Sequence, residues 1–384
     1  MKKYNTIINV IGDNNDFNIV ATHAFNPQKL VLIHDGSDEK KAYSDDIRDY
    51  YRKNFKDIEI IEETIYRPLY ESLEKILFRY KNEEAVINIT GSDTLVNLYI
   101  YNFSQIFTID YAYLEVAHSE IIIYRKGKIE KINIDLYDMN IDDFMSISGG
   151  KILWDNTPKY NDDKLEVIYN YIINKYDKWK KVKAIFKYRK NIEFHDYIYN
   201  RLLINTSELE EENINDLLEF LNILKHMHYI EYKYRKNQIR LDIKNEFAKS
   251  LILISGYWLE FITYSVVKTL DNIDDLKTGV VFLWDRDVED VKNELDILAS
   301  VDSSLICISC KDSKGYDQEA LNELNVYSRR ISKGKNIDIL VSTYYPQKEN
   351  VINRAKEMDI NIIVFDGDIS KFRNELQKII NNKG

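Results

Sequence analysis

Short apolar runs alternate with longer amphipathic segments over the first 150 residues. The apolar runs predict buried strands at residues 6–11, 29–34, 58–62 and 85–89. Residues 69–80 repeat apolar side chains at the spacing of one helix face. Strands that alternate with helices predict a parallel, doubly wound α/β sheet. Residues 120–124 and 128–134 predict a hairpin at its edge.

The pattern changes between about residues 156 and 245. Three helical patterns lead into two strand patterns separated by a Lys236-Asn237 turn, and helices followed by a hairpin resemble a winged-helix unit. Positive charges outnumber negative ones in this stretch. A cluster of Lys and Arg between residues 175 and 190 could contact phosphates, but the solvated face of a linker helix explains it as well.

The last third predicts a separate α/β domain with a mixed sheet. We expect one long helix from Glu246 to about Leu270, then an extended stretch at 280–283 and a strand at 293–298. A tight turn leads to a strand at 305–311, and helices alternate with strands from there to the final helix. The predicted domains are therefore residues 1–150, 156–245 and 246–384.

Composition narrows the class of protein. The chain has 384 residues with 45% hydrophobic and 30% charged side chains, which indicates a globular protein of two or three domains. Its net charge of −10 argues against a basic nucleic-acid coat protein. No signal peptide or 18-residue apolar run is evident, so we expect a cytoplasmic protein.

The isolated metal-type pairs are weak signals. Cys307 and Cys310 have a CxxC spacing, but no second pair exists and both fall in an apolar strand pattern. His226 and His228 are the only His residues at ligand spacing. A structural role accounts for both pairs more simply than metal binding.

Two predicted strands carry the candidate chemistry. Glu294 and Asp296 share one face of the first strand, and Ser309 and Lys311 share one face of the next. Because the turn between the strands is tight, Asp296 and Lys311 can approach each other, and Glu260 on the preceding helix can add a second acid. Two carboxylates beside a lysine suit metal-assisted phosphodiester hydrolysis. A cross-strand surface ion pair is the structural alternative.

Three sequence motifs resemble a known nuclease family. Gly256-Tyr257-Trp258-Leu259-Glu260, Asn293-Glu294-Leu295-Asp296 and Ile308-Ser309-Cys310-Lys311 are similar to the GxWLE, NELD and (E/S)CK motifs of a PD-(D/E)xK branch. That branch occurs in CRISPR ancillary nucleases activated by cyclic oligoadenylate. Asn88-Ile89-Thr90-Gly91 resembles the NITG loop of their N-terminal CARF sensor, a Rossmann-like domain.

The resemblance implies a role for each matching residue. Glu260 and Asp296 would be metal ligands, the main-chain carbonyl of Cys310 a further ligand, and Lys311 the catalytic lysine. Ser309 stands where the family usually has an acid. Its hydroxyl could bind the metal directly or through a water, and Glu294 could also contribute; the alternative is a weaker or inactive site. Mn²⁺ or Mg²⁺ would be the cofactor.

The sensor would bind its ligand at the carboxyl ends of the parallel strands. The turn after the first strand supplies Gly12, Asp13, Asn14 and Asn15, and the second loop supplies Thr90, Gly91, Ser92, Asp93 and Thr94. The family loop commonly continues Gly-Thr-Lys, so a basic residue is absent here. We therefore expect main-chain N–H groups of Gly91, Ser92 and the following helix to hold the phosphates.

The resemblance implies a function. The chain would be a homodimeric, metal-dependent endonuclease of type III CRISPR antiviral defence, with cyclic tetra-adenylate as the first candidate activator. Single-stranded DNA or RNA would be the substrate, with nicking of supercoiled DNA as a further activity. The alternative is a ligand-responsive nucleic-acid-binding regulator whose nuclease-like domain is inactive, which the missing acid at Ser309 would explain.

Overall fold

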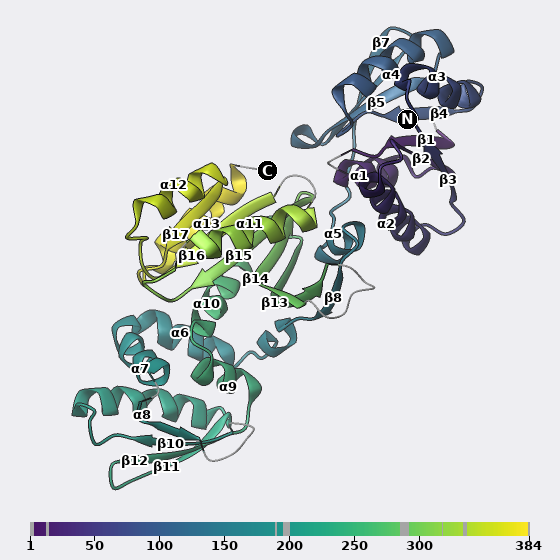
Figure 1. The fold of residues 1–384 in the computed structure, drawn as a ribbon. Helices are drawn as coiled ribbons and strands as arrows, with labels where there is room; N and C mark the ends of the chain where they lie inside the picture. The colour runs from purple at the N-terminus through teal and green to yellow at the C-terminus, as the bar shows by residue number, and fades with distance from the viewer. Residues whose placement is uncertain are drawn as a thin grey trace.

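The computed structural model describes residues 4–12, 15–188, 190–194, 200–284, 292–316, 318–332 and 336–382. Within them, the strands form three sheets of seven, four and six strands (Figure 1). The six-stranded sheet, built mainly from the last third of the chain, lies between the other two units. The order of the units in space therefore differs from their order in the sequence.

The N-terminal sheet has the strand order β3-β2-β1-β4-β5-β6-β7. Strands β1 to β5 are parallel, and β6 and β7 add an antiparallel hairpin at one edge, as the sequence predicts. The sequence did not predict strand β5, which lies between β4 and β6 in the sheet. The bounds are β1 Thr6–Val10, β2 Lys29–His34, β3 Glu59–Thr64, β4 Ala85–Asn88, β5 Asp110–Glu115, β6 Glu120–Arg125 and β7 Lys128–Asn133.

Helices cover both faces of this sheet, which completes the doubly wound arrangement. On one face, α1 (Asp16–Phe25) and α2 (Asp38–Asn54) bury aromatic and aliphatic side chains such as Tyr51. On the other, α3 (Leu69–Tyr80) and α4 (Thr94–Phe107) pack Leu77 and Phe103 on the strands. A short helix, η1 (Val116–His118), joins β5 to β6.

The middle unit combines three helices with a four-stranded sheet of order β11-β12-β10-β9. The sequence indicated the three helices and the β11–β12 hairpin, but not β9 and β10. Trp179 and Phe220 fill the core between helices and sheet. The bounds are η2 Thr157–Tyr160, α6 Leu165–Asn174, α7 Tyr176–Tyr188, β9 Ile192–Phe194, β10 Arg201–Asn205, α8 Glu211–His226, β11 Ile230–Arg235 and β12 Gln238–Ile243.

The third sheet is mixed and has the order β17-β16-β15-β14-β13-β8. Its edge strand β8 (Lys151–Trp154) comes from the chain before the middle unit and pairs with β13. The helix α5 (Ile141–Ile147) precedes β8 and contacts α2, β13 and α11. The other bounds are β13 Asp275–Leu283, β14 Lys292–Val301, β15 Ser304–Lys311, α11 Gln318–Ser332, β16 Asn336–Ser342, α12 Glu349–Glu357, β17 Ile360–Val364 and α13 Ile369–Asn381.

The prediction of one long helix from Glu246 to Leu270 is wrong. The segment forms α9 (Glu246–Leu253) and α10 (Tyr257–Val267). Gly256 lies between them with a φ of 95°, a left-handed conformation that ends one helix and caps the next. The break redirects the chain so that α10 packs on β14 and β15. None of the described helices is long and apolar enough to cross a membrane.

Candidate nuclease site and ligand pocket

Asp296 lies where β14 and β15 separate. The two strands pair from Val301 opposite Ser304 to Ile297 opposite Ile308, across a two-residue turn with left-handed residues. Just beyond that last pair, Oδ2 of Asp296 accepts hydrogen bonds from the Cys310 backbone N–H (2.6 Å) and the Ser309 hydroxyl (3.2 Å). The carboxylate is therefore held across the opening between two strands.

Glu260 approaches the same point from the first turn of α10. Its side chain lies deep enough that burial raises its pKa well above the usual range, and the negative charges of Asp296 and Glu294 add to this effect. Burial also raises the pKa of Asp296, while Lys311 and the two hydrogen bonds from β15 oppose the increase. Two acids that disfavour each other's charge need a cation beside them to remain ionised.

Lys311 and Glu294 complete the group that the sequence placed together. Lys311 is the last residue of β15 and is close enough to favour the charged forms of Glu260, Asp296 and Glu294. Burial raises the pKa of Glu294, and Asp296 raises it further. These acids and the lysine therefore lie near enough to affect one another's charge.

Glu323 is an acid that the sequence reasoning missed. It belongs to α11, which packs along β15, and its negative charge opposes ionisation of both Asp296 and Glu294. Glu323 lies 12 residues after Lys311, the last residue of the (E/S)CK-like motif, and nothing in the local sequence marks it as part of the site. Only the packing of α11 on the sheet brings this carboxylate near.

The donor atoms fit a hard divalent cation. Among the described residues, no group of three or more His, Cys, Asp or Glu side chains is placed to hold a metal ion. Mg²⁺ characteristically uses only one or two carboxylates and completes its shell with water and substrate phosphate oxygens. Glu260 and Asp296 would supply the two carboxylates and the Cys310 carbonyl a third oxygen, as the resemblance implies.

The sensor loops face a cavity of about 1070 Å³ at the carboxyl end of the N-terminal sheet. Of the predicted ligand residues, Gly12, Gly91, Ser92 and Asp93 line it. Asp13 and Asn14 lie outside the described residues. The cavity occupies the position that open α/β sheets use for ligands.

The two loops touch at their glycines. A Cβ on Gly12 would lie 2.2 Å from the carbonyl oxygen of Gly91, so no larger residue fits there. Asn15 is buried and its amide spans the first turn, since it accepts from the Gly12 N–H and donates to the Gly12 carbonyl. Thr90 is also buried, and its hydroxyl accepts a hydrogen bond from the Leu114 N–H. Asn15 and Thr90 therefore stabilise the conformation of the two loops by hydrogen bonds to the main chain.

The N-terminus of α4 is already capped by protein. The Asp93 side chain accepts hydrogen bonds from the N–H groups of Leu95 and Val96, which the sequence reasoning had assigned to ligand phosphates. Thr94 is the first residue of the helix. The cavity instead has Lys40 and Arg67 in its wall, two cations that the sequence did not single out because they come from the start of α2 and from the segment before α3.

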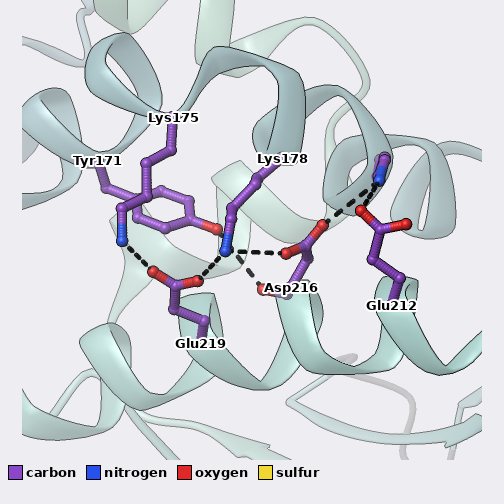
Figure 2. Close-up of polar contacts among 7 residues, drawn as sticks. Tyr171, Lys175, Lys178, Glu212, Asp216 and Glu219 are labelled. Carbon is purple, nitrogen blue, oxygen red and sulfur yellow. Dashed lines mark hydrogen bonds and ion pairs between the residues drawn. The ribbon is translucent and has the colours of Figure 1, made fainter.

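Lysines at the start of α7 and just before it pair with acids of α8, although their side chains remain partly exposed to solvent (Figure 2). Glu219 of α8 binds both Lys175 and Lys178, and Lys178 also lies 3.2 Å from Asp216. Lys181 lies 2.6 Å from Glu212. These ion pairs join α7 to α8, so interhelical pairing accounts for the cluster without a nucleic-acid partner.

The remaining candidate pairs have structural environments. Cys307 and Cys310 are both buried free thiols, and the Cys310 sulfur lies 3.6 Å from the Thr263 hydroxyl oxygen. His226 contacts the Asn222 carbonyl through Nδ1, and His228 adopts a left-handed conformation at the turn into β11. Neither pair forms a metal cluster among the described residues.

Comparison with known proteins gives a family match for the C-terminal third of the chain and structural matches for the fold of almost the whole chain. Residues 248–382 match the family model described as "Card1-like, endonuclease domain". The structure of Can2 from Sulfobacillus thermosulfidooxidans in complex with cyclic tetra-adenylate is 17% identical, covers 99% of this chain and 98% of its own, and superposes with a TM-score of 0.71.

Protein VC1899 from Vibrio cholerae, also 17% identical over 99% of this chain and 98% of its own, superposes with a TM-score of 0.76. No match was found among curated proteins. The predicted fold class and family resemblance are confirmed. The chain shares the fold of these two proteins over almost its whole length, and residues 248–382 are similar to a Card1-like endonuclease domain.

Proposed function

We propose that this protein is a metal-dependent endonuclease that a cyclic oligoadenylate switches on. The observation that carries the proposal is the convergence of Glu260, Asp296 and Lys311 within a segment that matches an endonuclease family model. The sequence alone left a surface ion pair open as an alternative for Asp296 and Lys311. The burial of Asp296 and the presence of a second acid, Glu260 from α10, favour the catalytic interpretation. A surface ion pair requires neither burial nor a second acid.

Each residue has a distinct part in hydrolysis. A bound divalent cation would lower the pKa of a water molecule and offset charge on the phosphate. Glu260 and Asp296 would hold that cation, and the hydrogen bonds from Ser309 and Cys310 keep the Asp296 carboxylate in one orientation. The Lys311 ammonium orients the attacking water or stabilises charge that develops on the phosphate.

Ser309 acts here as a support for Asp296, because its hydroxyl donates to Oδ2. The charge that the family acid normally provides at this position is available from the neighbouring Glu294 and Glu323. The absence of an acid at position 309 is therefore compatible with an active site.

A cyclic oligoadenylate would bind in the 1070 Å³ cavity of the N-terminal unit. Lys40 and Arg67 would contact phosphates, and the closely packed Gly12 and Gly91 would let the ligand approach main-chain atoms. Cyclic tetra-adenylate is the first candidate, since Can2, which shares the fold, is described in complex with it.

The protein would act as a homodimer joined through α4. This helix exposes Leu95 (47%), Leu98 (61%) and Tyr101 (56%) at a spacing that places them along one side. Leu95 also lines the ligand cavity, so a second copy packed on this side would bring two cavities together. A ring of repeated nucleotides has the rotational symmetry to bind across such a two-fold axis.

The surface beside the carboxylates suits single-stranded nucleic acid. Trp154 on β8 pairs with Val281, which pairs with Glu294, so all three share one face of the sheet. At two strand spacings, Trp154 lies about 10 Å from Glu294. Its side chain is 49% exposed, and the Lys292 ammonium lies 5.0 Å from its ring centroid. An aromatic ring with a cation can stack a base and hold its phosphate.

The test is a cleavage assay with Mn²⁺, single-stranded RNA and DNA, supercoiled DNA and a panel of cyclic oligoadenylates. We expect cleavage that depends on one ring size and is lost in Asp296→Ala and Lys311→Ala. No cleavage under any ligand, combined with sequence-specific duplex binding, would overturn the proposal in favour of a ligand-responsive regulator.

A further inference from the structure

Asp312 directly follows the candidate catalytic Lys311 and is the centre of a buried polar network. Its carboxylate accepts hydrogen bonds from the Lys183 ammonium (2.8 and 2.9 Å), the Trp258 indole N–H (2.8 Å) and the Thr343 hydroxyl (2.7 Å). The Lys187 ammonium donates to its main-chain carbonyl at 2.7 Å. Both main-chain and side-chain oxygens of this one residue are therefore held.

The donors come from separate parts of the fold. Trp258 lies on α10 two residues before Glu260, and Thr343 directly follows β16. Lys183 and Lys187 lie on α7 of the middle unit. The network thus joins the end of the strand that carries Lys311 to the helix that carries Glu260, and ties both to a helix from a different sheet unit.

The pairing is strongest at Lys183. Its side chain is 15% exposed and that of Asp312 is 4% exposed, so water screens the pair poorly. The Lys183 ammonium also lies 4.4 Å from the Trp258 ring centroid, a cation–π distance. Burial alone would raise the pKa of Asp312, but the charge of Lys183 and the three side-chain donors hold it below its usual value.

The lysines in and next to α7 pair with two different parts of the protein. Lys178 and Lys181 of α7, and Lys175 just before it, pair with acids of α8 inside the middle unit. Lys183 and Lys187 instead reach the nuclease strand. One helix therefore carries an internal set of ion pairs and a separate set that contacts the residue next to Lys311.

We propose that Asp312 is a positioning residue that sets the distance between Glu260 and the end of β15, and that Lys183 links this geometry to the middle unit. The inference rests on the proposed metal-dependent function. Because the ligand oxygens of Glu260 and Cys310 come from the two elements that Asp312 joins, loss of the network separates those oxygens. A movement of α7 relative to β15 would likewise reach the site through Lys183.

The test compares Lys183→Met and Asp312→Asn with Lys181→Met, a matched variant on the same helix whose ion pair stays within the middle unit. The primary measurement is Mn²⁺ affinity by calorimetry, which does not require cleavage. Supporting contacts around metal ligands typically change affinity 10- to 100-fold. We expect about that loss for Lys183→Met and Asp312→Asn, with little change for Lys181→Met.

Two further variants separate positioning from general stability. Lys183→Arg keeps the charge and should retain most of the affinity, and Lys183→Met should add little to Asp312→Asn if Lys183 acts through that carboxylate. Melting temperatures identify any variant that fails to fold. If Lys183→Met does not fold, the Mn²⁺ affinity of Asp312→Asn, which preserves the shape of the side chain, tests the inference. Wild-type affinity in both single variants, or equal losses in Lys183→Met and Lys181→Met, would overturn the inference. A wild-type protein that binds no Mn²⁺ would overturn the proposed function as well.

Discussion

Replacing Asp296 by Asn should stabilise the metal-free protein while it abolishes cleavage. The Asn side-chain oxygen can still accept from the Cys310 N–H and the Ser309 hydroxyl, so the local fold is retained. What disappears is a negative charge that Glu260 and Glu294 repel. The same charge is what a divalent cation requires, so stability and activity should change in opposite directions.

The size of the effect follows from simple electrostatics. Two like charges about 7 Å apart repel by roughly 2 kcal/mol at an effective dielectric constant near 20. Hydrogen bonds to a neutral acceptor are weaker, and the attraction of Lys311 is lost. Together these effects reduce the gain in stability by about 1 kcal/mol. The net gain of about 1 kcal/mol corresponds to a rise of roughly 2–4 °C in melting temperature. Loss of a metal ligand costs several kcal/mol of transition-state stabilisation, or about 1000-fold in rate.

The direction of the pKa shift of Asp296 predicts how the stability of the metal-free protein changes with pH. Burial raises the pKa of Asp296, so the folded state holds its proton in a range where the unfolded state has lost it. The stability of the metal-free protein therefore falls as pH rises from about 4 through the raised pKa. Asp296→Asn lacks this titration, so its advantage should be present at pH 8 and absent near pH 4.

Melting curves in EDTA at several pH values, with cleavage assays in Mn²⁺, measure both effects. Asp368→Asn is a matched control, because it changes the N-cap acid of α13 to an equally good cap. A lower melting temperature for Asp296→Asn in EDTA at pH 8 would refute the repulsion argument. Retained cleavage would refute the assignment of Asp296 as a metal ligand.

Three other predictions concern substrate, ligand and assembly. Trp154→Ala should weaken binding of single-stranded oligonucleotides about 5- to 100-fold in fluorescence titrations, whereas Trp154→Phe should keep much of the affinity. Equal affinities for the Ala and Phe variants would exclude stacking on this ring. Gly12→Ala should abolish cyclic oligoadenylate binding in calorimetry, because its Cβ would collide with the Gly91 carbonyl, and wild-type affinity would exclude the cavity as the ligand site. Leu98→Glu should shift the protein from dimer to monomer in light scattering, since it places a charge in the exposed apolar side of α4.

The local pattern of the chain predicted most elements of the N-terminal unit and of the middle unit. The strand at Lys29–His34 and the helix at Leu69–Tyr80 have the predicted bounds, because each is specified by its own periodicity. The turn between β14 and β15 was equally local, and it brought Asp296 toward β15 as expected. Local signals suffice where a segment and its partner are neighbours along the chain.

Tertiary structure decided what depends on distant segments. β8 joins a sheet whose other strands begin 121 residues later at Asp275, and no local pattern specifies that partner. The periodicity of residues 246–270 continues through Gly256, so the turn of the chain there appears only in its φ angle. The lysines of α7 look alike in the sequence, yet packing pairs one group with α8 and another with Asp312.

The candidate site shows the same division. Residue types and spacing within single strands indicated acids and a lysine, because covalent connection fixes which side chains share a strand. The raised pKa values of Glu260 and Asp296, the approach of Glu323 and the network at Asp312 arise from burial and from helices brought in by packing. Burial and long-range contacts are properties of the folded chain, so only the structure could show them.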